Sequence, residues 1–153
     1  KVINVAEQQG KLLRIDGNLM FTQTNFTKLK EKVTSRQIAA RQLGSGLEAL
    51  EGLQTPRVAD DCSHVYYYFP IQYKKRHELV KHMMMNGCDV AIQHIKNCAD
   101  LECFKKFYRD CPNSRATGSE TILLPTYPRY SVKNVEKNID AIQTFFSTKG
   151  GST

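Results

Sequence analysis

The segment Asn86–Tyr130, NGCDVAIQHIKNCADLECFKKFYRDCPNSRATGSETILLPTYPRY, carries the densest series of strand, turn and helix signals in the chain. It opens on Asn-Gly, a pair that commonly ends a helix because both residues tolerate a left-handed backbone. Residues 88–94 are then predicted to form a strand, and 100–109 a short helix. Pro112 suits the first turn of a further helix, and residues 120–124 are predicted to form another strand.

A long helix is predicted upstream of this segment, from about residue 19 to residue 43. It lacks proline and internal glycine, and the side chains of one predicted buried stripe recur every three or four residues. At 1.5 Å per residue it would be about 37 Å long. The sequence Gly-Ser-Gly at 44–46 is expected to end or kink it. The stripe consists of Phe26, Leu29, Val33, Gln37 and Ala40.

Residues 64–72 form the clearest predicted strand, because they are dense in aromatic and β-branched side chains. Pro70 near its end indicates an edge position or a bulge. A helix over 76–86 follows. The last predicted helix is capped by Ser131, and its apolar stripe consists of Val132, Val135, Ile139, Ile142 and Phe146.

Strands alternating with helices predict an α/β fold, specifically an α+β two-layer sandwich. We expect about three strands in a mainly antiparallel sheet covered by helices, with the long helix at the N-terminal side. The folded domain is expected to cover residues 18–147. Residues 1–17 form an N-terminal segment without an assigned fold, and 148–153 a disordered tail.

The composition is that of an ordinary globular protein, with 41% hydrophobic and 24% charged residues among 153. No apolar run reaches the roughly 18 residues of a membrane span, and no signal peptide is recognisable, so we expect a cytoplasmic protein. Five cysteines are an odd number, and reduced thiols are expected rather than disulfides. Their spacing matches no zinc pattern, so no metal site is predicted.

The net charge is +7, with basic residues gathered at 28–41 and 74–76. A basic patch can bind nucleic acid through phosphates. The lysines of the long helix, however, point in different directions, and no recognition-helix or RNA-binding signature is present. A solvated face or a site for a small anion is therefore favoured over nucleic acid.

From about residue 19 to residue 146 the chain resembles the C-terminal small domain of the DegT/DnrJ/StrS-type sugar aminotransferases, which are fold type I enzymes dependent on pyridoxal phosphate (PLP). The order of the motifs carries the resemblance more than any one of them. One departure is Glu102, which stands where the family has proline. The matching motifs are SRQIA at 35–39, the aromatic strand at 64–71, NGC…QH at 86–94, NCADL at 97–101, CPNS at 111–114 and LPTYP at 124–128.

The resemblance implies a bacterial, cytoplasmic aminotransferase that acts on a keto-sugar, expected to be nucleotide-linked, with Glu or Gln as amino donor. It also implies that the intact enzyme is a homodimer, and that the lysine binding PLP belongs to a large domain absent from this chain. No catalytic residue is therefore assigned, and the fragment alone is not expected to catalyse transamination or to bind PLP. The alternative is a non-catalytic binding or interaction domain of the same fold with a basic surface.

The resemblance places the segment around His94 near the sugar substrate, so His94 and Asn97 are the first candidates for a substrate-facing edge. Their ring and amide groups can hydrogen-bond to sugar hydroxyls or to a diphosphate. Lys96 and Arg36 could pair with phosphate. Each candidate also has a structural alternative: His94 as a hydrogen-bonded histidine at a strand end, Asn97 as a helix cap, and Lys96 as a solvated lysine.

Overall fold

The computed structural model describes residues 13–15, 19–21, 23–92 and 96–149. Along the chain the elements are β1 (Leu13–Ile15), β2 (Leu19–Phe21), α2 (Gln23–Leu47), β3 (Tyr68–Gln72), α3 (Arg76–Met85), the 3-10 helices η1 (Cys98–Asp100) and η2 (Glu102–Phe107), α4 (Pro112–Glu120), β4 (Thr121–Pro125) and α5 (Val132–Lys149). The mixed α and β architecture predicted from the sequence is confirmed. Among the described residues, no helix is both long enough and apolar enough to cross a bilayer.

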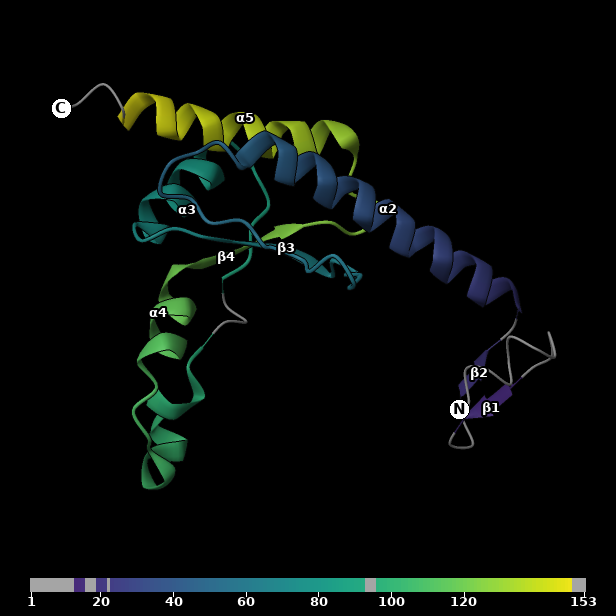
Figure 1. Cartoon of the computed structure of the whole chain (residues 1–153), viewed down its shortest axis with the longest axis horizontal. Helices are drawn as coiled ribbons and strands as arrows, with labels where there is room; N and C mark the ends of the chain where they lie inside the picture. The colour runs from purple at the N-terminus through teal and green to yellow at the C-terminus, as the bar shows by residue number, and fades with distance from the viewer. Residues whose placement is uncertain (1–12, 16–18, 22, 93–95, 150–153) are drawn as a thin grey trace.

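The central sheet pairs β3 with β4 in antiparallel register, so that Phe69 lies opposite Leu124 and Ile71 opposite Ile122. The predicted strand at 88–94 is wrong within its described part: only Ala91 joins the sheet, through two hydrogen bonds with Leu123 of 3.0 and 2.9 Å. The expected count of about three strands therefore falls to two in this sheet. The separate hairpin β1–β2 lies at the outer end of α2 (Figure 1).

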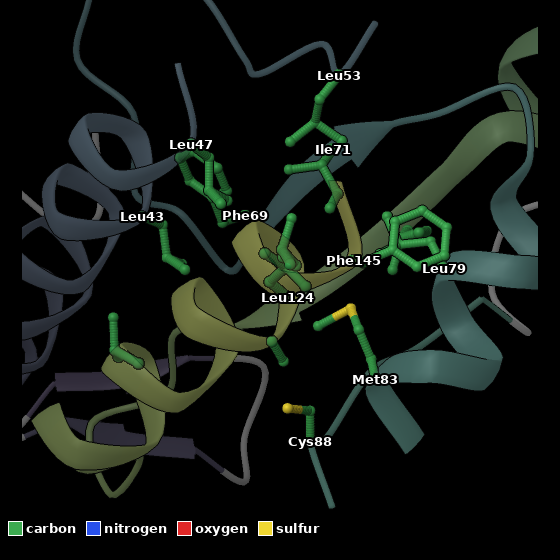
Figure 2. Packing of buried hydrophobic residues seen from close by; sticks show 14 of the residues in the cluster. Leu43, Leu47, Leu53, Phe69, Ile71, Leu79, Met83, Cys88, Leu124 and Phe145 are labelled. Carbon is green, nitrogen blue, oxygen red and sulfur yellow. The ribbon is translucent and has the colours of Figure 1, made fainter. Parts of the chain in front are cut away.

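One face of the β3–β4 sheet is covered by α3, α5 and the C-terminal part of α2 (Figure 1). Because side chains alternate along a strand, Phe69 and Ile71 point together into this layer. Fully burying a side chain of this size contributes about 1.5–3 kcal/mol. Residues from α2, β3, α3, β4 and α5 meet in one buried cluster (Figure 2). The cluster includes Leu43, Leu47, Phe69, Ile71, Leu79, Met83, Ile122, Leu124, Ile142 and Phe145.

Strand β3 is shorter than the predicted 64–72, because the backbone of Tyr66 has a positive φ of 52° that no regular strand accommodates. Pro70 does sit at an edge. The amide of Gln72 donates outward to Gln54 at 2.9 Å, and Pro70, two residues earlier, directs its nitrogen to the same side. Its missing N–H therefore costs the β3–β4 ladder no hydrogen bond.

Helix α2 is displaced from the predicted range of about 19–43: it begins at Gln23, after β2, and continues through Gly44–Gly46 to Leu47 instead of ending there. A side chain built at Gly46 would lie 2.8 Å from Ile139 of α5. This glycine therefore permits a close approach of two helices rather than ending one. The N-terminal half of α2 extends beyond the sheet (Figure 1), which leaves Leu29 of the predicted buried stripe 54% exposed.

The α3 helix ends as predicted at Asn86-Gly87, where Gly87 has a φ of 64°. Ser131 caps α5 by accepting a hydrogen bond from the Asn134 amide at 3.3 Å. The predicted short helix at 100–109 is replaced by two 3-10 helices, η1 and η2. η1, η2 and α4 form a lobe that projects from the sheet (Figure 1). Phe107, in this lobe, is 71% exposed, and Phe104 is also exposed. Val132, in the first turn of α5, is likewise exposed.

Candidate functional site

Asn97, the described member of the first pair of candidates, lies where the chain leaves the sheet and enters the projecting lobe. Its Oδ1 accepts hydrogen bonds from the Ala99 amide at 3.4 Å and from the Ser114 hydroxyl at 3.1 Å. Its Nδ2 donates to Asp100 at 2.9 Å. Asn97 is therefore the N-cap of η1, as the structural alternative predicted. An amide offers two acceptor and two donor positions, so one N–H remains for a ligand.

His94 lies outside the described residues. Lys96 is exposed and forms no hydrogen bond or ion pair with another described residue. Its backbone, like that of Asn97, packs against Gly118 of α4: a side chain built at Gly118 would lie 3.6 Å from the Asn97 nitrogen and 3.9 Å from the Lys96 carbonyl carbon. The position of α4 thus fixes the backbone on which Lys96 and Asn97 stand.

Arg36 is placed elsewhere, on α2, and no hydrogen bond joins it to Lys96 or Asn97 among the described residues. Its Nη1 donates to the carbonyl of Tyr67 at 2.7 Å and to that of Tyr66 at 3.4 Å. Its guanidinium carbon lies 5.0 Å from the centre of the Tyr67 ring, a cation–π distance. Arg36 therefore fastens α2 to the loop in which Tyr66 has its unusual backbone conformation.

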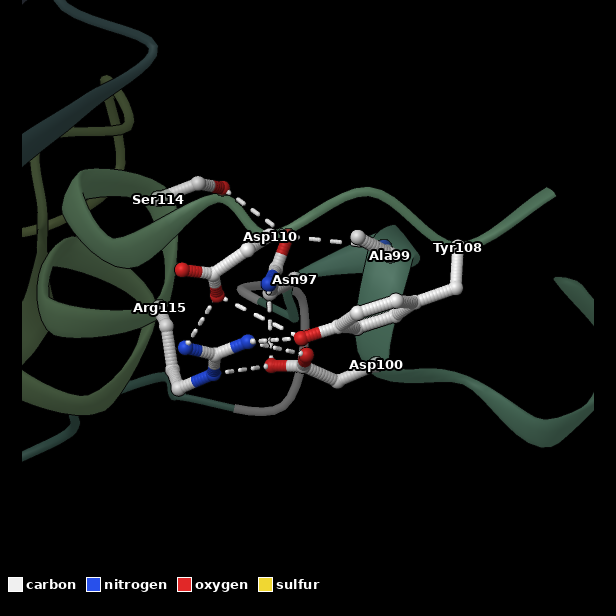
Figure 3. A network of polar contacts seen from close by, with 7 residues as sticks. All are labelled: Asn97, Ala99, Asp100, Tyr108, Asp110, Ser114 and Arg115. Atoms are coloured by element: carbon white, nitrogen blue, oxygen red, sulfur yellow. Dashed lines mark hydrogen bonds and ion pairs between the residues drawn. The ribbon is translucent and has the colours of Figure 1, made fainter. Parts of the chain in front are cut away.

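Arg115 of α4 is the centre of the polar network in the lobe (Figure 3). Its Nε and Nη2 donate to the two carboxylate oxygens of Asp100 at 2.9 and 2.8 Å. Its Nη1 donates to Asp110 at 3.0 Å, and Nη2 also donates to the hydroxyl of Tyr108 at 3.2 Å. Bidentate guanidinium–carboxylate geometry combines charge with fixed direction. Because Asp100 also accepts from Asn97, the network links α4 directly to the candidate edge.

The network shifts the ionisation of its members. Hydrogen bonds from Arg115 and then from Asn97 lower the pKa of Asp100 below its usual range. The hydrogen bonds to Asp100, Asp110 and Tyr108 raise the pKa of Arg115 still further above neutrality. The side chains of Asp100, Tyr108, Asp110 and Arg115 are exposed to solvent, so the network orients the loop more than it stabilises the whole fold. Sequence analysis missed Arg115, since no periodicity links positions 100 and 115.

A second network fastens the base of α4. Arg76, the first residue of α3, donates through Nη1 to the carbonyl of Gly118 at 2.6 Å. That carbonyl belongs to the last turn of α4, where a positive charge is favourable because helix carbonyls there lack partners. Arg76 therefore joins the lobe to α3, and through its contact with Gly118 it also supports the backbone of Asn97.

Two groups close to the start of α5, the half-buried Tyr130 and the buried Cys88, have shifted pKa values. The Tyr130 hydroxyl donates to Oδ1 of the fully buried Asn138 at 3.1 Å, and burial raises the pKa of Tyr130. Burial also raises the pKa of the Cys88 thiol, partly offset by the nearby Lys137 ammonium. A buried protonated thiol is a poor nucleophile, so Cys88 is a core residue.

The described residues do not fit PLP. A lysine that forms a covalent bond with PLP has to be desolvated or held beside another cation so that it can lose its proton. Every lysine whose side chain is described is exposed to solvent. No group of three or more His, Cys, Asp or Glu among the described residues could hold a metal ion.

Several solved structures share the fold. DesV from S. venezuelae superposes with a TM-score of 0.76 at 18% identity, covering 94% of this chain and 43% of DesV. PseC from Helicobacter pylori, an aminotransferase involved in the biosynthesis of pseudoaminic acid, gives 0.72 at 10% identity over 94% of this chain and 45% of PseC. The putative sugar aminotransferase Spr1654 from Streptococcus pneumoniae, solved in its PLP form, gives 0.71 at 14% identity over 82% of this chain and 34% of Spr1654.

This chain therefore spans less than half the length of each of these three proteins. No curated protein sequence matches it. A family match covers residues 16–143, which is most of the chain and includes the sheet, the lobe and most of α5. The chain belongs to the DegT/DnrJ/EryC1/StrS aminotransferase family, whose members depend on PLP.

Proposed function

We propose that this chain is the C-terminal small domain of a PLP-dependent aminotransferase that acts on a keto-sugar, with the sugar linked to a nucleotide and Glu or Gln as amino donor. The family match over residues 16–143 carries the proposal. The partial coverage of the solved neighbours supports the assignment to one domain of a larger enzyme. Five free cysteines suit the reducing cytoplasm of a bacterium, where we place this enzyme.

In this proposal the rest of the enzyme holds PLP, because no described lysine has the burial that the covalent bond requires. When bound, PLP supplies the electron sink through which an amino group moves between donor and acceptor. The small domain contributes no group to that step. It closes one side of the substrate cleft and orients the sugar nucleotide.

The candidate edge is suited to orienting such a substrate. The remaining N–H of Asn97 can donate to a sugar hydroxyl or a phosphate oxygen, and its acceptor positions are already used within the lobe. The Lys96 ammonium can pair with a diphosphate oxygen. We extend the same role to His94 from the family resemblance. Arg36 can contribute only through the guanidinium N–H groups that do not donate to the carbonyls of Tyr66 and Tyr67.

The test uses the complete polypeptide that contains this chain, supplied with glutamate or glutamine and a panel of nucleotide-linked keto-sugars. Mass spectrometry of the sugar product should show a carbonyl replaced by an amine. Lys96→Met should raise KM for the sugar nucleotide about ten-fold with little change in kcat. This is the result expected when a contact that binds the substrate and the transition state equally is removed. The matched control is Lys105→Met in the same lobe, whose ammonium contacts Glu102 at 3.2 Å. Equal KM values for the two variants would contradict the proposed edge.

A second candidate function is a non-catalytic interaction domain of the same fold. The exposed lysines of the projecting part of α2 favour it, because Lys28 and Lys32 lie one turn apart on the same side of the helix and add positive charge there. A complete polypeptide without a PLP-binding lysine domain would support this second function. One that carries such a domain, and that is a homodimer by sedimentation, would support the aminotransferase.

A further inference from the structure

An open groove of about 590 Å³ runs between α2 and the beginning of α5. Its apolar wall consists of Ile38, Ala39, Tyr127, Tyr130, Val132 and Val135, and its polar end carries Lys30 and Glu31. The rings of Tyr127 and Tyr130 meet edge to face, with their centres 5.2 Å apart. The groove is therefore a surface built from two separate segments of the chain, α2 and residues 127–135.

The groove exposes side chains that usually lie inside proteins. Ile38 is 45% exposed, Val132 53% and Tyr127 40%. Ile38 does not belong to the core-facing side of α2, because that helix directs a different face to the core through Ala40, Leu43 and Leu47. At 100° per residue, Ile38 points almost opposite to Ala40. Helix α2 thus carries apolar side chains on two faces, and among the described residues only one of them is covered.

The comparisons indicate what covers the second face. More than half of DesV, of PseC and of Spr1654 lies outside the part that aligns with this chain. We propose that the groove is the docking surface for an apolar segment of the corresponding remaining part of this aminotransferase polypeptide. This inference rests on the proposed function, since it takes the partner from the same enzyme.

The charges around the groove specify the segment further. Lys28, Lys30 and Lys32 are exposed where α2 projects past the sheet, and Glu31 is the acidic residue among them. A docked segment with acidic residues beside its apolar ones would match both parts of this surface. A strongly basic segment would be repelled at the Lys30 end of the groove.

Thiol labelling tests the docking. Ile38→Cys and Val132→Cys lie on opposite walls, so that if one variant fails to fold the other still reports on the groove. Met85→Cys, on an exposed residue at the end of α3, is the control. Each variant is made in this 153-residue chain and in the complete polypeptide, and is labelled with a maleimide. Peptide mass spectrometry separates the new thiol from the five native cysteines.

In the complete polypeptide we expect the two groove thiols to react about ten-fold or more slowly than in the chain alone, because burial removes access to the thiolate. The Met85→Cys thiol should react equally in both. Equal rates at Ile38→Cys in both proteins would overturn the inference. So would slow labelling already in the chain alone, which would mean that the chain's own residues fill the groove, and so would equal slowing of all three thiols.

The PLP content of the complete polypeptide is measured separately. A protected groove in a polypeptide that binds no PLP would refute the aminotransferase function while retaining the docking surface. A PLP-binding enzyme with freely reactive groove thiols would refute the docking surface alone.

Discussion

Arg115 and Asp100 face each other across the lobe through two hydrogen bonds of 2.9 and 2.8 Å, one to each carboxylate oxygen (Figure 3). Fifteen residues separate them in the chain. Their pairing fixes the turn at 97–101 against α4, and that turn carries Asn97 and follows Lys96. The orientation of the candidate substrate edge thus depends on the contact of Asp100 with Arg115, although Arg115 itself is not part of that edge.

Replacing Arg115 should loosen this turn without unfolding the domain. In Arg115→Ala the carboxylates of Asp100 and Asp110 lose their shared partner, so the amides of Ala99 and Leu101 should exchange with deuterium faster, while those of β3 and β4 should not change. Lys105→Ala, which removes another exposed ion pair of the lobe, is the control. Unchanged exchange at Ala99 in Arg115→Ala would show that the network does not hold the turn.

The same contact should be sensitive to acid. The pKa of Asp100 is lowered in the folded lobe by Arg115 and then Asn97, so the ionised carboxylate favours the folded turn. This contribution is present above the ordinary pKa of aspartate and is lost as pH falls through the lowered value. Carboxyl chemical shifts followed by NMR should show Asp100 titrating below the ordinary range. In Arg115→Ala its titration should return toward that range; a titration that is the same in both proteins would refute the cause given.

Two glycines of α2 should respond oppositely to alanine. At Gly46 the new methyl group would lie 2.8 Å from Ile139, and overpacking of this kind costs about 1–3 kcal/mol. At Gly44 nothing lies within 4 Å, so alanine should stabilise the helix by up to about 1 kcal/mol. Urea unfolding measures both free energies. Ile139→Ala should relieve the effect of Gly46→Ala, and equal stability of the two glycine variants would argue against the close helix contact.

Replacing single leucines of α2 by alanine should show which part of the helix is buried and which part projects from the fold. Leu43 is fully buried in the cluster, and Leu43→Ala should cost about 2–5 kcal/mol of unfolding free energy. Leu29→Ala in the isolated chain should change it by less than about 0.5 kcal/mol, because Leu29 is largely exposed. A large loss from Leu29→Ala in chemical denaturation would mean that this end of α2 is covered within the chain.

The five cysteines should differ in reactivity. Cys62, Cys98 and Cys103 are exposed, whereas Cys88 is buried and has a raised pKa. At neutral pH a thiol reagent should modify the three exposed cysteines first and Cys88 only when the domain unfolds. Mass spectrometry of labelled peptides over time gives the order. Early modification of Cys88 would show that the α3–α5 region opens readily.

Sequence patterns predicted the elements whose side chains repeat with a regular period and face one core. They located β3, β4, α3, α5, the middle of α2 and the Asn97 cap, because these follow from local spacing and local hydrogen bonding. They misplaced Leu29 and Val132, since periodicity gives a direction on a helix but not the point at which the core ends. They also misjudged Gly46, where the decisive atom belongs to Ile139, ninety-three positions away in the sequence.

The candidate edge was predicted from the family resemblance. The contacts that hold its backbone in place were not predicted. Arg115 and Arg76 have no periodic or motif signal, and Ser114 stands in the CPNS motif without any sign of its contact with Asn97, because their partners lie on other elements. Arg36 illustrates the converse. It stands in a family-like motif, yet its guanidinium is bound to the carbonyls of Tyr66 and Tyr67, an interaction that only the three-dimensional arrangement reveals.

The central claim is that this chain supplies a substrate-facing edge and the rest of the enzyme holds PLP. The most direct measurement incubates PLP with this 17.4 kDa chain and, separately, with the complete polypeptide, reduces both with borohydride, and determines their intact masses. We predict one covalently retained PLP on the complete polypeptide and none at a defined lysine of the isolated chain. Stoichiometric PLP on a single lysine of the isolated chain would contradict the account.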